Sequence, residues 1–447
     1  MKKVITYGTY DLLHHGHIRL LERAKALGDY LIVGVTADSF DQARGKLNVE
    51  QSLMERIEAV RATGLADEII VEEYEGQKID DIRRYGVDVF TVGSDWRGKF
   101  DYLKEYCQVV YLDRTEGISS TELRSEHHQL RLGLVGESPI LNKIERESRF
   151  VNGMQISGVC TVDDRPLSDS LREQSMPMEQ LDELIEKSDA LYVISHPRCH
   201  YEHVRRALQA GRHVLCESPI CIDPQQLAEL RQLAQQQGCV LADSLKTAYS
   251  LAYARLVLLA KSGIIGQIVS VDATCTSMAY YEVADDASMP YLWNSIGAWG
   301  PTALLPIFEL LGTDYRQKTI ATHLHQHIAD FDTFTKISFV FPNAVASAKV
   351  GQGVKSEGEL IVSGTRGYIY VPAPWWKTDY FEVRYENTAD NRRYFYQLEG
   401  EGLRYELVSF LKTVQTGKTA GYVSADTSAA IVSVVNDFYQ KKDVVLI

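Results

Sequence analysis

Short apolar runs alternate with amphipathic segments near the start of the chain. The apolar runs predict strands over residues 3–7, 29–36, 68–71, 87–92 and 109–112. Residues 18–27 carry apolar side chains at helical spacing, which predicts a helix. Gly28 follows it directly, and glycine commonly follows the end of a helix. Strands that alternate with helices build a parallel sheet with helices on both faces. We therefore predict an α/β domain over residues 1–126.

The same alternation restarts after a polar segment at residues 125–129. Further strands are predicted over residues 130–136, 156–162, 190–195, 213–217 and 240–242. Amphipathic helices are predicted between them, for example over residues 201–210 and 224–237. This number of strands suits a second α/β domain of dinucleotide-binding size, which we place at residues 130–248.

The hydrophobic period changes to two from about Tyr249. Alternating runs predict strands over residues 268–276, 335–341, 344–350, 359–362 and 368–371. Turns at residues 342–343 and 365–367 would join neighbouring strands as hairpins. The pattern predicts an open, mostly antiparallel sheet with one buried and one polar face, in a third domain at residues 249–447.

Composition narrows the class of protein. A chain of 447 residues is too long for one hydrophobic core, and a hydrophobic share of 45% is that of an ordinary globular protein. The formal net charge of -13 disfavours binding to nucleic acid or to an anionic membrane, since both require clustered positive charge. Small anionic substrates would therefore need local basic pockets.

The amino terminus lacks the apolar run of a secretory signal, and no stretch reaches the ~18 apolar residues that read as a membrane-spanning helix. The seven cysteines contain no CxxC pair. We therefore expect a cytoplasmic protein with reduced thiols, no structural metal site, and no nucleic-acid or membrane partner.

A turn rich in glycine and histidine follows the first predicted strand. Residues 8–17 read GTYDLLHHGH and lie at the carboxyl end of a strand, where open α/β sheets bind ligands. Gly16 lets the backbone approach a nucleotide, and His14 and His17 can direct two imidazoles at the same phosphates. Fixed donors aimed at the charge that develops during nucleotidyl transfer would supply most of the catalysis. Two histidines held by local hydrogen bonds at a helix start fit the same residues.

A second phosphate-binding pattern follows the last strand of this domain. Ser119, Ser120 and Thr121 open a predicted helix, whose unsatisfied N–H groups and positive dipole end favour a polyphosphate. Arg114 adds a planar cationic group. An ordinary capped helix fits the same residues. Two such patterns at neighbouring strand ends favour nucleotide binding.

These two patterns, together with GSDW and GKFDYLKEYC between them, closely resemble the glycerol-3-phosphate cytidylyltransferases of the HxGH nucleotidyltransferase superfamily, over residues 1 to about 124. The resemblance implies that CTP and a polyol phosphate yield a CDP-polyol and pyrophosphate, with Mg2+ accompanying CTP. It gives His14 and His17 the role of stabilising the transition state, and Lys46 and Arg114 that of holding the triphosphate. The implied nucleotide pocket comprises Thr9, Tyr10, Asp11, Gly16, Asp95, Thr115, Ile118, Ser119, Ser120 and Thr121.

Two departures from that family leave the polyol open. His15 stands where the family commonly has another aromatic residue, and Tyr74 where it has tryptophan. Glycerol 3-phosphate, glycerol 2-phosphate and a longer alditol phosphate all fit. A more distant interpretation is an adenylyltransferase for a coenzyme precursor, against which the GSDW and GKFD segments argue.

The segment GRHVLCESP at residues 211–219, with His200 upstream, resembles the Gfo/Idh/MocA oxidoreductases over residues 130–447. The implied fold is a second Rossmann domain followed by an α+β domain with an open sheet. Gly136 would lie at the pyrophosphate turn, Glu217 at the cofactor site, and Asp163 at the adenosine ribose. The implied cofactor is NAD or NADP, and Asp163 would favour NAD.

This second resemblance lacks the family's usual catalytic groups. Ser218 replaces the catalytic lysine, and the family's aspartate and histidine align near Ala298 and Thr302. Glu137 stands where the pyrophosphate charge would lie. Lys246 is the candidate substitute acid, although a surface lysine fits the sequence equally well.

The leading hypothesis from the sequence is a bifunctional enzyme. An oxidoreductase half would supply the polyol phosphate that the first domain activates for teichoic-acid or capsule synthesis. The alternative is a cytidylyltransferase with a non-catalytic scaffold half. The family's habit of dimerising suggests homo-oligomers.

Overall fold

The structure, a computed structural model, divides the chain into two compact units. The first comprises Met1–Gln129 with Val151–Gly153, and the second Leu130–Phe150 with Met154–Ile447. All residues are described except 44–48, 50, 75, 114–128, 138, 152, 279–292, 329, 397, 399 and 418–422. Within the described part of the chain, no helix has both the length and the apolar character needed to cross a membrane.

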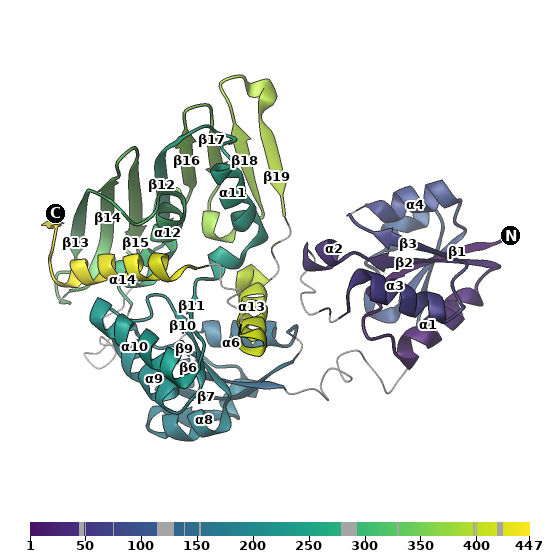
Figure 1. The fold of residues 1–447 in the computed structure, drawn as a ribbon, viewed down its shortest axis with the longest axis horizontal. Helices are drawn as coiled ribbons and strands as arrows, with labels where there is room; N and C mark the ends of the chain where they lie inside the picture. The colour runs from purple at the N-terminus through teal and green to yellow at the C-terminus, as the bar shows by residue number, and fades with distance from the viewer. Residues whose placement is uncertain are drawn as a thin grey trace. The chain divides into compact units, whose positions relative to one another are not determined.

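The first unit is built on a parallel sheet in the order β3-β2-β1-β4-β5 (Figure 1). Its strands are β1 (Lys3–Gly8), β2 (Tyr30–Thr36), β3 (Glu68–Glu72), β4 (Val89–Gly93) and β5 (Gln108–Leu112). All five predicted strands are therefore confirmed. The strand order reverses between β1 and β4, so the ligand crevice typical of such sheets opens beyond the carboxyl ends of these two strands.

Helices cover both faces of this sheet. They are α1 (His15–Lys25), α2 (Asp38–Ala43), α3 (Leu53–Ala62) and α4 (Gln77–Tyr85), with 3-10 turns η1 (Ser94–Trp96) and η2 (Asp101–Glu105). Leu31 and Val33 of β2 belong to the core that includes Val60 of α3, whereas Ile32 belongs to the opposite core with Ile82 of α4. Successive side chains of a strand point to opposite faces, so an apolar run is buried on both sides.

The second unit begins with a parallel sheet in the order β11-β10-β9-β6-β7-β8. Its strands are β6 (Leu130–Gly136), β7 (Met154–Thr161), β8 (Ser175–Pro177), β9 (Ala190–Ile194), β10 (His213–Glu217) and β11 (Leu241–Ser244). Its helices are α6 (Ile140–Ser148), α7 (Asp169–Arg172), α8 (Leu181–Lys187), α9 (Pro197–Gln209) and α10 (Pro224–Gln237), with the 3-10 turn η3 (Met178–Gln180). The short edge strand β8 was not predicted, because three residues ending in proline carry too little of an alternating pattern.

A larger sheet follows in the same unit, in the order β19-β18-β17-β16-β12-β15-β14-β13-β20. Its strands are β12 (Ile268–Thr276), β13 (Gln317–Leu324), β14 (Asp332–Val340), β15 (Val345–Gly351), β16 (Leu360–Gly364), β17 (Tyr368–Val371), β18 (Tyr380–Arg384), β19 (Arg392–Phe395) and β20 (Val444–Leu446). The pairs β12/β15 and β13/β20 are parallel, and the other paired strands are antiparallel. A mostly antiparallel sheet and both predicted hairpins are therefore confirmed.

Helices connect the two sheets of the second unit (Figure 1). They are α11 (Leu251–Lys261), α12 (Ser295–Leu311), α13 (Leu403–Thr416) and α14 (Ala425–Tyr439), with the 3-10 turns η4 (Lys246–Tyr249), η6 (Trp375–Lys377), η7 (Thr388–Asp390) and η8 (Gly400–Gly402). Helix α12 packs on strands β12, β14 and β15, and α14 contacts both α12 and α10. Helix α13 contacts α6 and η4, so it brings residues 403–416 against the first helix of the parallel sheet's domain.

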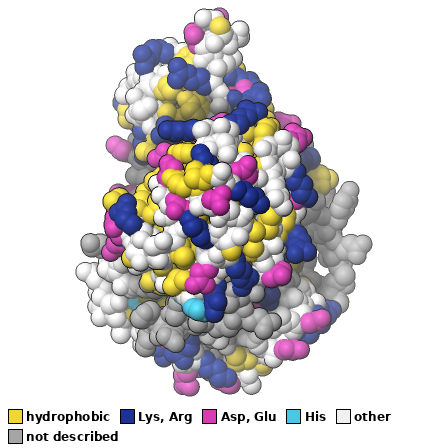
Figure 2. Space-filling model, turned by 90° about the vertical axis from the view of Figure 1, so that its right-hand side faces the viewer, with side chains coloured by type: hydrophobic (Ala, Val, Ile, Leu, Met, Phe, Trp, Pro, Cys, Tyr) yellow, Lys and Arg dark blue, Asp and Glu magenta, His cyan; other side chains and the backbone are white. Residues whose placement is uncertain are grey.

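On the face shown in Figure 2, acidic and basic side chains are interspersed among polar and apolar ones. A protein that binds nucleic acid through its surface charge gathers Lys and Arg into a patch or stripe. On this face, the Lys and Arg side chains of the described residues are not gathered in that way.

Candidate functional site

The two histidines predicted to act on phosphate lie together at the start of α1. His14 is the N-cap residue, and its Nδ1 accepts a hydrogen bond from the backbone N–H of Gly16 at 3.0 Å. The rings of His14 and His17 stack with centroids 3.9 Å apart and an interplanar angle of 21°. Because Nδ1 of His14 is an acceptor, a neutral ring carries its proton on Nε2. The local hydrogen bond therefore orients the Nε2–H of His14. A histidine held by a local hydrogen bond at a helix start can thus also act on phosphate, so the two interpretations of these residues are compatible.

Tyr10 packs against one of these two histidines. The side chain is 2% exposed, and its ring meets the ring of His17 edge to face with centroids 5.6 Å apart. The backbone of Tyr10 has a φ of 53°, a left-handed conformation that is uncommon for a residue with a side chain. A Cβ on Gly8 would lie 3.0 Å from the Tyr10 ring, which is closer than an ordinary contact, so a larger residue there would push against the ring. In this geometry Tyr10 positions His17.

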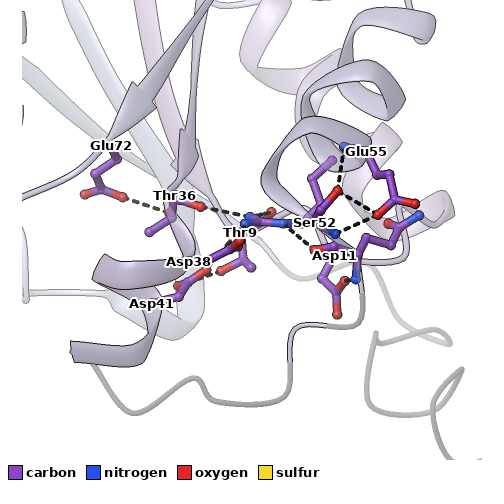
Figure 3. Close-up of polar contacts among 10 residues, drawn as sticks. Thr9, Asp11, Thr36, Asp38, Asp41, Ser52, Glu55 and Glu72 are labelled. Atoms are coloured by element: carbon purple, nitrogen blue, oxygen red, sulfur yellow. Dashed lines mark hydrogen bonds and ion pairs between the residues drawn. The ribbon is translucent and has the colours of Figure 1, made fainter.

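Thr9 and Asp11 lie in the turn between β1 and the histidines, and both are bonded to later segments (Figure 3). The hydroxyl of Thr9 donates to Asp41 Oδ1 of α2 at 3.0 Å. The carboxylate of Asp11 accepts from the backbone N–H of Gln51 at 3.0 Å, and the Gln51 side chain accepts from the Leu12 N–H at 2.8 Å. The turn is thus shaped by polar contacts with residues about forty positions away.

Arg56 of α3 joins these segments, and the sequence analysis did not identify it. The side chain is fully buried. Its guanidinium donates to the carbonyl oxygens of Thr9 at 2.7 Å, Thr36 at 2.8 Å and Gln51 at 3.1 Å, and it forms an ion pair with Asp38. One planar cation with five donors therefore holds together the ends of β1 and β2 and the segment before α3. In the sequence, the buried role of Arg56 is indicated by its position beside apolar residues on the face of the helix that packs on the sheet.

The remaining predicted residues of the first unit fall into two groups. Gly16 lies in the first turn of α1, and the exposed Asp95 lies in η1, directly after β4. Gly16 and Asp95 thus follow the two strands at which the sheet order reverses. Seven predicted residues lie outside the described part of the chain: Lys46, Arg114, Thr115, Ile118, Ser119, Ser120 and Thr121.

Gly136 ends β6, the first strand of the second unit, and Glu137 follows it. Gly136 has a φ of 153°, and a Cβ there would lie 2.7 Å from the backbone carbonyl carbon of Ile194, so only glycine fits. Glu137 is partly buried, and its burial raises the pKa of the carboxyl to about 7. The acidic side chain at the expected pyrophosphate position therefore carries only part of its charge near neutral pH.

Asp163, predicted at the adenosine ribose, follows β7. Its carboxylate accepts two hydrogen bonds from Arg165, from Nη2 at 2.7 Å and from Nε at 2.8 Å. Hydrogen bonds from Arg165 lower the pKa of Asp163. The position predicted for the adenosine ribose therefore has an arginine, Arg165, beside the aspartate that the sequence indicated.

Glu217, at the end of β10, faces a second carboxylate across Ser244. Ser244 Oγ lies 3.0 Å from Glu406 Oε2 and 3.4 Å from Glu217 Oε2. The hydroxyl of Tyr192 donates to Glu406 Oε2 at 2.9 Å. Burial raises the pKa of Glu217 to about 7, and burial together with the Glu217 charge raises that of Glu406 to about 8. The pair can thus hold a proton at neutral pH.

Lys246, the candidate acid, lies in η4 after β11. Its ammonium lowers the pKa of both Glu217 and Glu406, but burial raises each pKa by more. Its Nζ lies 3.6 Å from Glu401 Oε2. Ser218, which replaces the family's lysine, is 3% exposed. Ala298 and Thr302 lie one turn apart on α12. Of these four residues, only Lys246 has an ionisable side chain.

The fold and the histidine site define the class of protein: a nucleotidyltransferase-type unit followed by a Rossmann unit of the oxidoreductase type. Residues 5–126 match the family model described as cytidylyltransferase-like, and residues 132–243 match that of the oxidoreductase family with an NAD-binding Rossmann fold.

Curated relatives identify the first unit further. The glycerol-3-phosphate cytidylyltransferases of Bacillus spizizenii and Staphylococcus aureus are each 52% identical to this chain, over 126 and 129 residues. The matches cover 28% of this chain and 97% and 95% of those enzymes. The chain therefore belongs, through its first unit, to the cytidylyltransferase family of these enzymes, and residues 132–243 of its second unit match the Gfo/Idh/MocA oxidoreductase family.

Solved structures resemble the second unit. KijD10, a 3-ketoreductase from Actinomadura kijaniata in complex with NADP and TDP-benzene, aligns with a TM-score of 0.62 at 15% identity, over 72% of this chain and 100% of its own. An aldose-aldose oxidoreductase from Caulobacter crescentus aligns with a TM-score of 0.61 at 15% identity, over 70% of this chain and 98% of its own. Similarity at this level of identity establishes the fold.

Proposed function

We propose that the first unit converts CTP and glycerol 3-phosphate to CDP-glycerol and pyrophosphate. The observation that carries the proposal is the stacked pair of His14 and His17 at the carboxyl end of β1, where the strand order reverses. The names of the relatives that are 52% identical over this unit support the same substrates.

The reaction requires charge stabilisation. An oxygen of the polyol phosphate forms a bond to the α-phosphorus of CTP, and the bond from that phosphorus to the bridging oxygen of pyrophosphate breaks. Negative charge grows on the α-phosphate oxygens and on the leaving group, where the imidazole N–H groups and the start of α1 would stabilise it. No covalent intermediate is needed. Mg2+ would accompany CTP and neutralise part of the triphosphate charge.

The first test is nucleotide choice. With glycerol 3-phosphate and Mg2+, we expect the full-length protein to release pyrophosphate from CTP at least ~100-fold faster than from ATP, because a pocket that hydrogen-bonds one base leaves its polar groups unpaired with another. Glycerol 2-phosphate and a five-carbon alditol phosphate serve as parallel acceptors and identify the polyol. Faster turnover of ATP than of CTP would contradict the assignment.

We also propose that the second unit is an NADP-dependent reductase of a short ketose phosphate, which supplies the polyol phosphate for teichoic-acid or capsule synthesis. Arg165 beside Asp163 suits the 2′-phosphate of NADP, in place of the NAD preference expected from Asp163 alone. Two structural neighbours of this unit were solved in complex with NADP.

Reduction of a ketone creates an alkoxide that must gain a proton. The bound nicotinamide would supply the hydride. Lys246 would donate the proton, and the Glu217–Glu406 pair, which can hold a proton near neutral pH, would return one to it. The rival proposal is a scaffold without catalysis, favoured by the absence of a lysine at residue 218.

Binding of a nicotinamide nucleotide at two pH values distinguishes the reductase proposal from the scaffold proposal. We expect NADPH to bind more tightly at pH 6 than at pH 8, because a Glu137 carboxyl with a pKa of about 7 is charged at the higher pH and repels pyrophosphate. Glu137→Gln should tighten binding roughly 10-fold at pH 8 and change it little at pH 6. Fluorescence titration measures both, with Glu183→Gln on α8 as control. If the wild-type protein binds neither NADPH nor NADH at either pH, the scaffold proposal replaces the reductase.

A further inference from the structure

Three lysines from separate segments of the second unit converge on one carboxylate. Lys143 comes from α6, Lys246 from η4 and Lys377 from η6. Their Nζ atoms lie 2.7, 3.6 and 3.0 Å from the carboxylate oxygens of Glu401 in η8. We refer to these three side chains as the lysine cluster. The segments are far apart in sequence, so the fold alone assembles the lysine cluster.

The lysine cluster and Glu401 line a pocket of about 620 Å³. This volume is within the range of sites for small molecules, roughly 300–1,000 Å³. Arg146 and Glu145 are the other charged residues of the lining, and Glu145 also forms an ion pair with Arg149. The lining thus has four cations and two carboxylates. A positive pocket stands out in a chain whose net charge is -13.

Glu401 is held in this pocket by a constrained turn. Burial would raise the pKa of its carboxyl, but the ion pairs with Lys143 and Lys377 outweigh burial and lower the pKa to about 2. The backbone of Glu401 has a φ of 55°, between two glycines that also have positive φ. A non-glycine residue in this conformation is strained and persists only where its surroundings hold it. Here the ammonium groups hold it.

The charge of the lysine cluster is not balanced by Glu401, so a purely structural ion pair does not account for all three lysines. Three ammonium groups face a single carboxylate with one negative charge and two oxygens. A phosphate monoester carries about -1.5 to -2 charge at pH 7 and three terminal oxygens that accept strong hydrogen bonds. A phosphate monoester therefore complements three lysines better than Glu401 does, in both charge and number of acceptors.

We propose that this pocket binds the phosphate group of a phosphomonoester substrate, and that Glu401 is an internal competitor which the phosphate displaces from the lysine cluster. Lys246 lies beside both Glu401 and the Glu217–Glu406 pair, so a phosphate here would lie next to the groups proposed to supply the proton. A short ketose phosphate has the matching chemistry, because its carbonyl lies within a few bonds of its phosphate. The identity of the ligand's carbonyl end rests on the proposed reductase, whereas the phosphate site itself does not.

The test is calorimetric titration of the full-length protein with dihydroxyacetone phosphate and, in parallel, with unphosphorylated dihydroxyacetone. We expect only the phosphate ester to bind measurably. Lys143→Met and Lys377→Met should each weaken binding at least ~10-fold, since each removes one charge-assisted hydrogen bond to phosphate. Glu401→Gln should tighten binding about 10-fold, because it removes the competing charge. Lys187→Met on α8, whose lysine pairs with Glu183 at 2.6 Å, serves as the matched control and should leave binding unchanged.

Opposite effects of the lysine and Glu401 variants separate a binding site from a structural ion cluster. If Glu401→Gln weakens binding, or if both lysine variants bind like the wild type, the proposal is wrong. If the lysine variants weaken NADPH binding and leave that of the ester intact, the pocket serves the cofactor and the substrate assignment is wrong. Melting temperatures confirm that each variant folds, and either lysine variant suffices if the other does not. CTP turnover, measured separately, reports on the first unit. Binding of the ester at the first unit should be unchanged by the lysine and Glu401 variants, so the variants distinguish the two sites.

Discussion

Replacement of His14 or His17 by alanine is expected to lower kcat for CTP turnover by at least ~100-fold. Each imidazole would face charge that develops only in the transition state, and removal of one such donor typically costs about 10²–10³ in kcat. Because the two rings stack 3.9 Å apart, loss of one also removes the packing that orients the other. The double variant should therefore lose less than the product of the two single effects.

Steady-state kinetics of pyrophosphate release measures this prediction and separates kcat from KM. The matched control is Arg19→Ala on the exposed side of the same helix, where the side chain forms polar contacts with His15 and Glu22. Its turnover should stay close to that of the wild type. Wild-type kcat in both histidine variants would refute the proposed site, and a change confined to KM would make the histidines binding groups without a catalytic role.

Arg56→Met is expected to destabilise the first unit by about 3–5 kcal/mol, the usual cost of removing one partner from a buried ion pair. Asp41, 2% exposed in its side chain, would lose the cation 3.9 Å away. The carbonyl oxygens of Thr9 and Thr36 would lose buried donors. Since Thr9 begins the turn that carries the histidines, CTP turnover should fall as well.

Hydrogen exchange resolves this prediction by unit. Peptides from β1 and β2 should lose protection in Arg56→Met, and peptides from the second unit should keep it. The control is Arg61→Met on the same helix, because Arg61 is exposed and pairs with the exposed Glu58, and such pairs contribute little. Equal protection of β1 and β2 in the two variants would show that Arg56 does not hold these segments together.

Local patterns in the sequence determined the elements and the position of the first site. The runs that predict β1 to β5 are apolar at most of their positions, because both faces of a parallel sheet are covered, and such runs are recognisable without knowledge of their neighbours. His14, Gly16 and His17 lie within four residues, so one helix start places them together. The edge strand β8 escaped prediction, because it has three residues and no period.

The tertiary structure alone decided how the buried charges are partnered. Arg56 reads as one more polar residue of a helix until the strand order brings Thr9 and Thr36 beside it. Tyr192 and Glu406 are 214 positions apart, yet their side chains meet at 2.9 Å. Glu401 reads as a loop carboxylate until the fold brings three lysines to it. Backbone periodicity depends on neighbours along the chain and can be read from the sequence, whereas the pKa and the partners of a buried charge depend on groups that only the folded chain brings within a few ångströms.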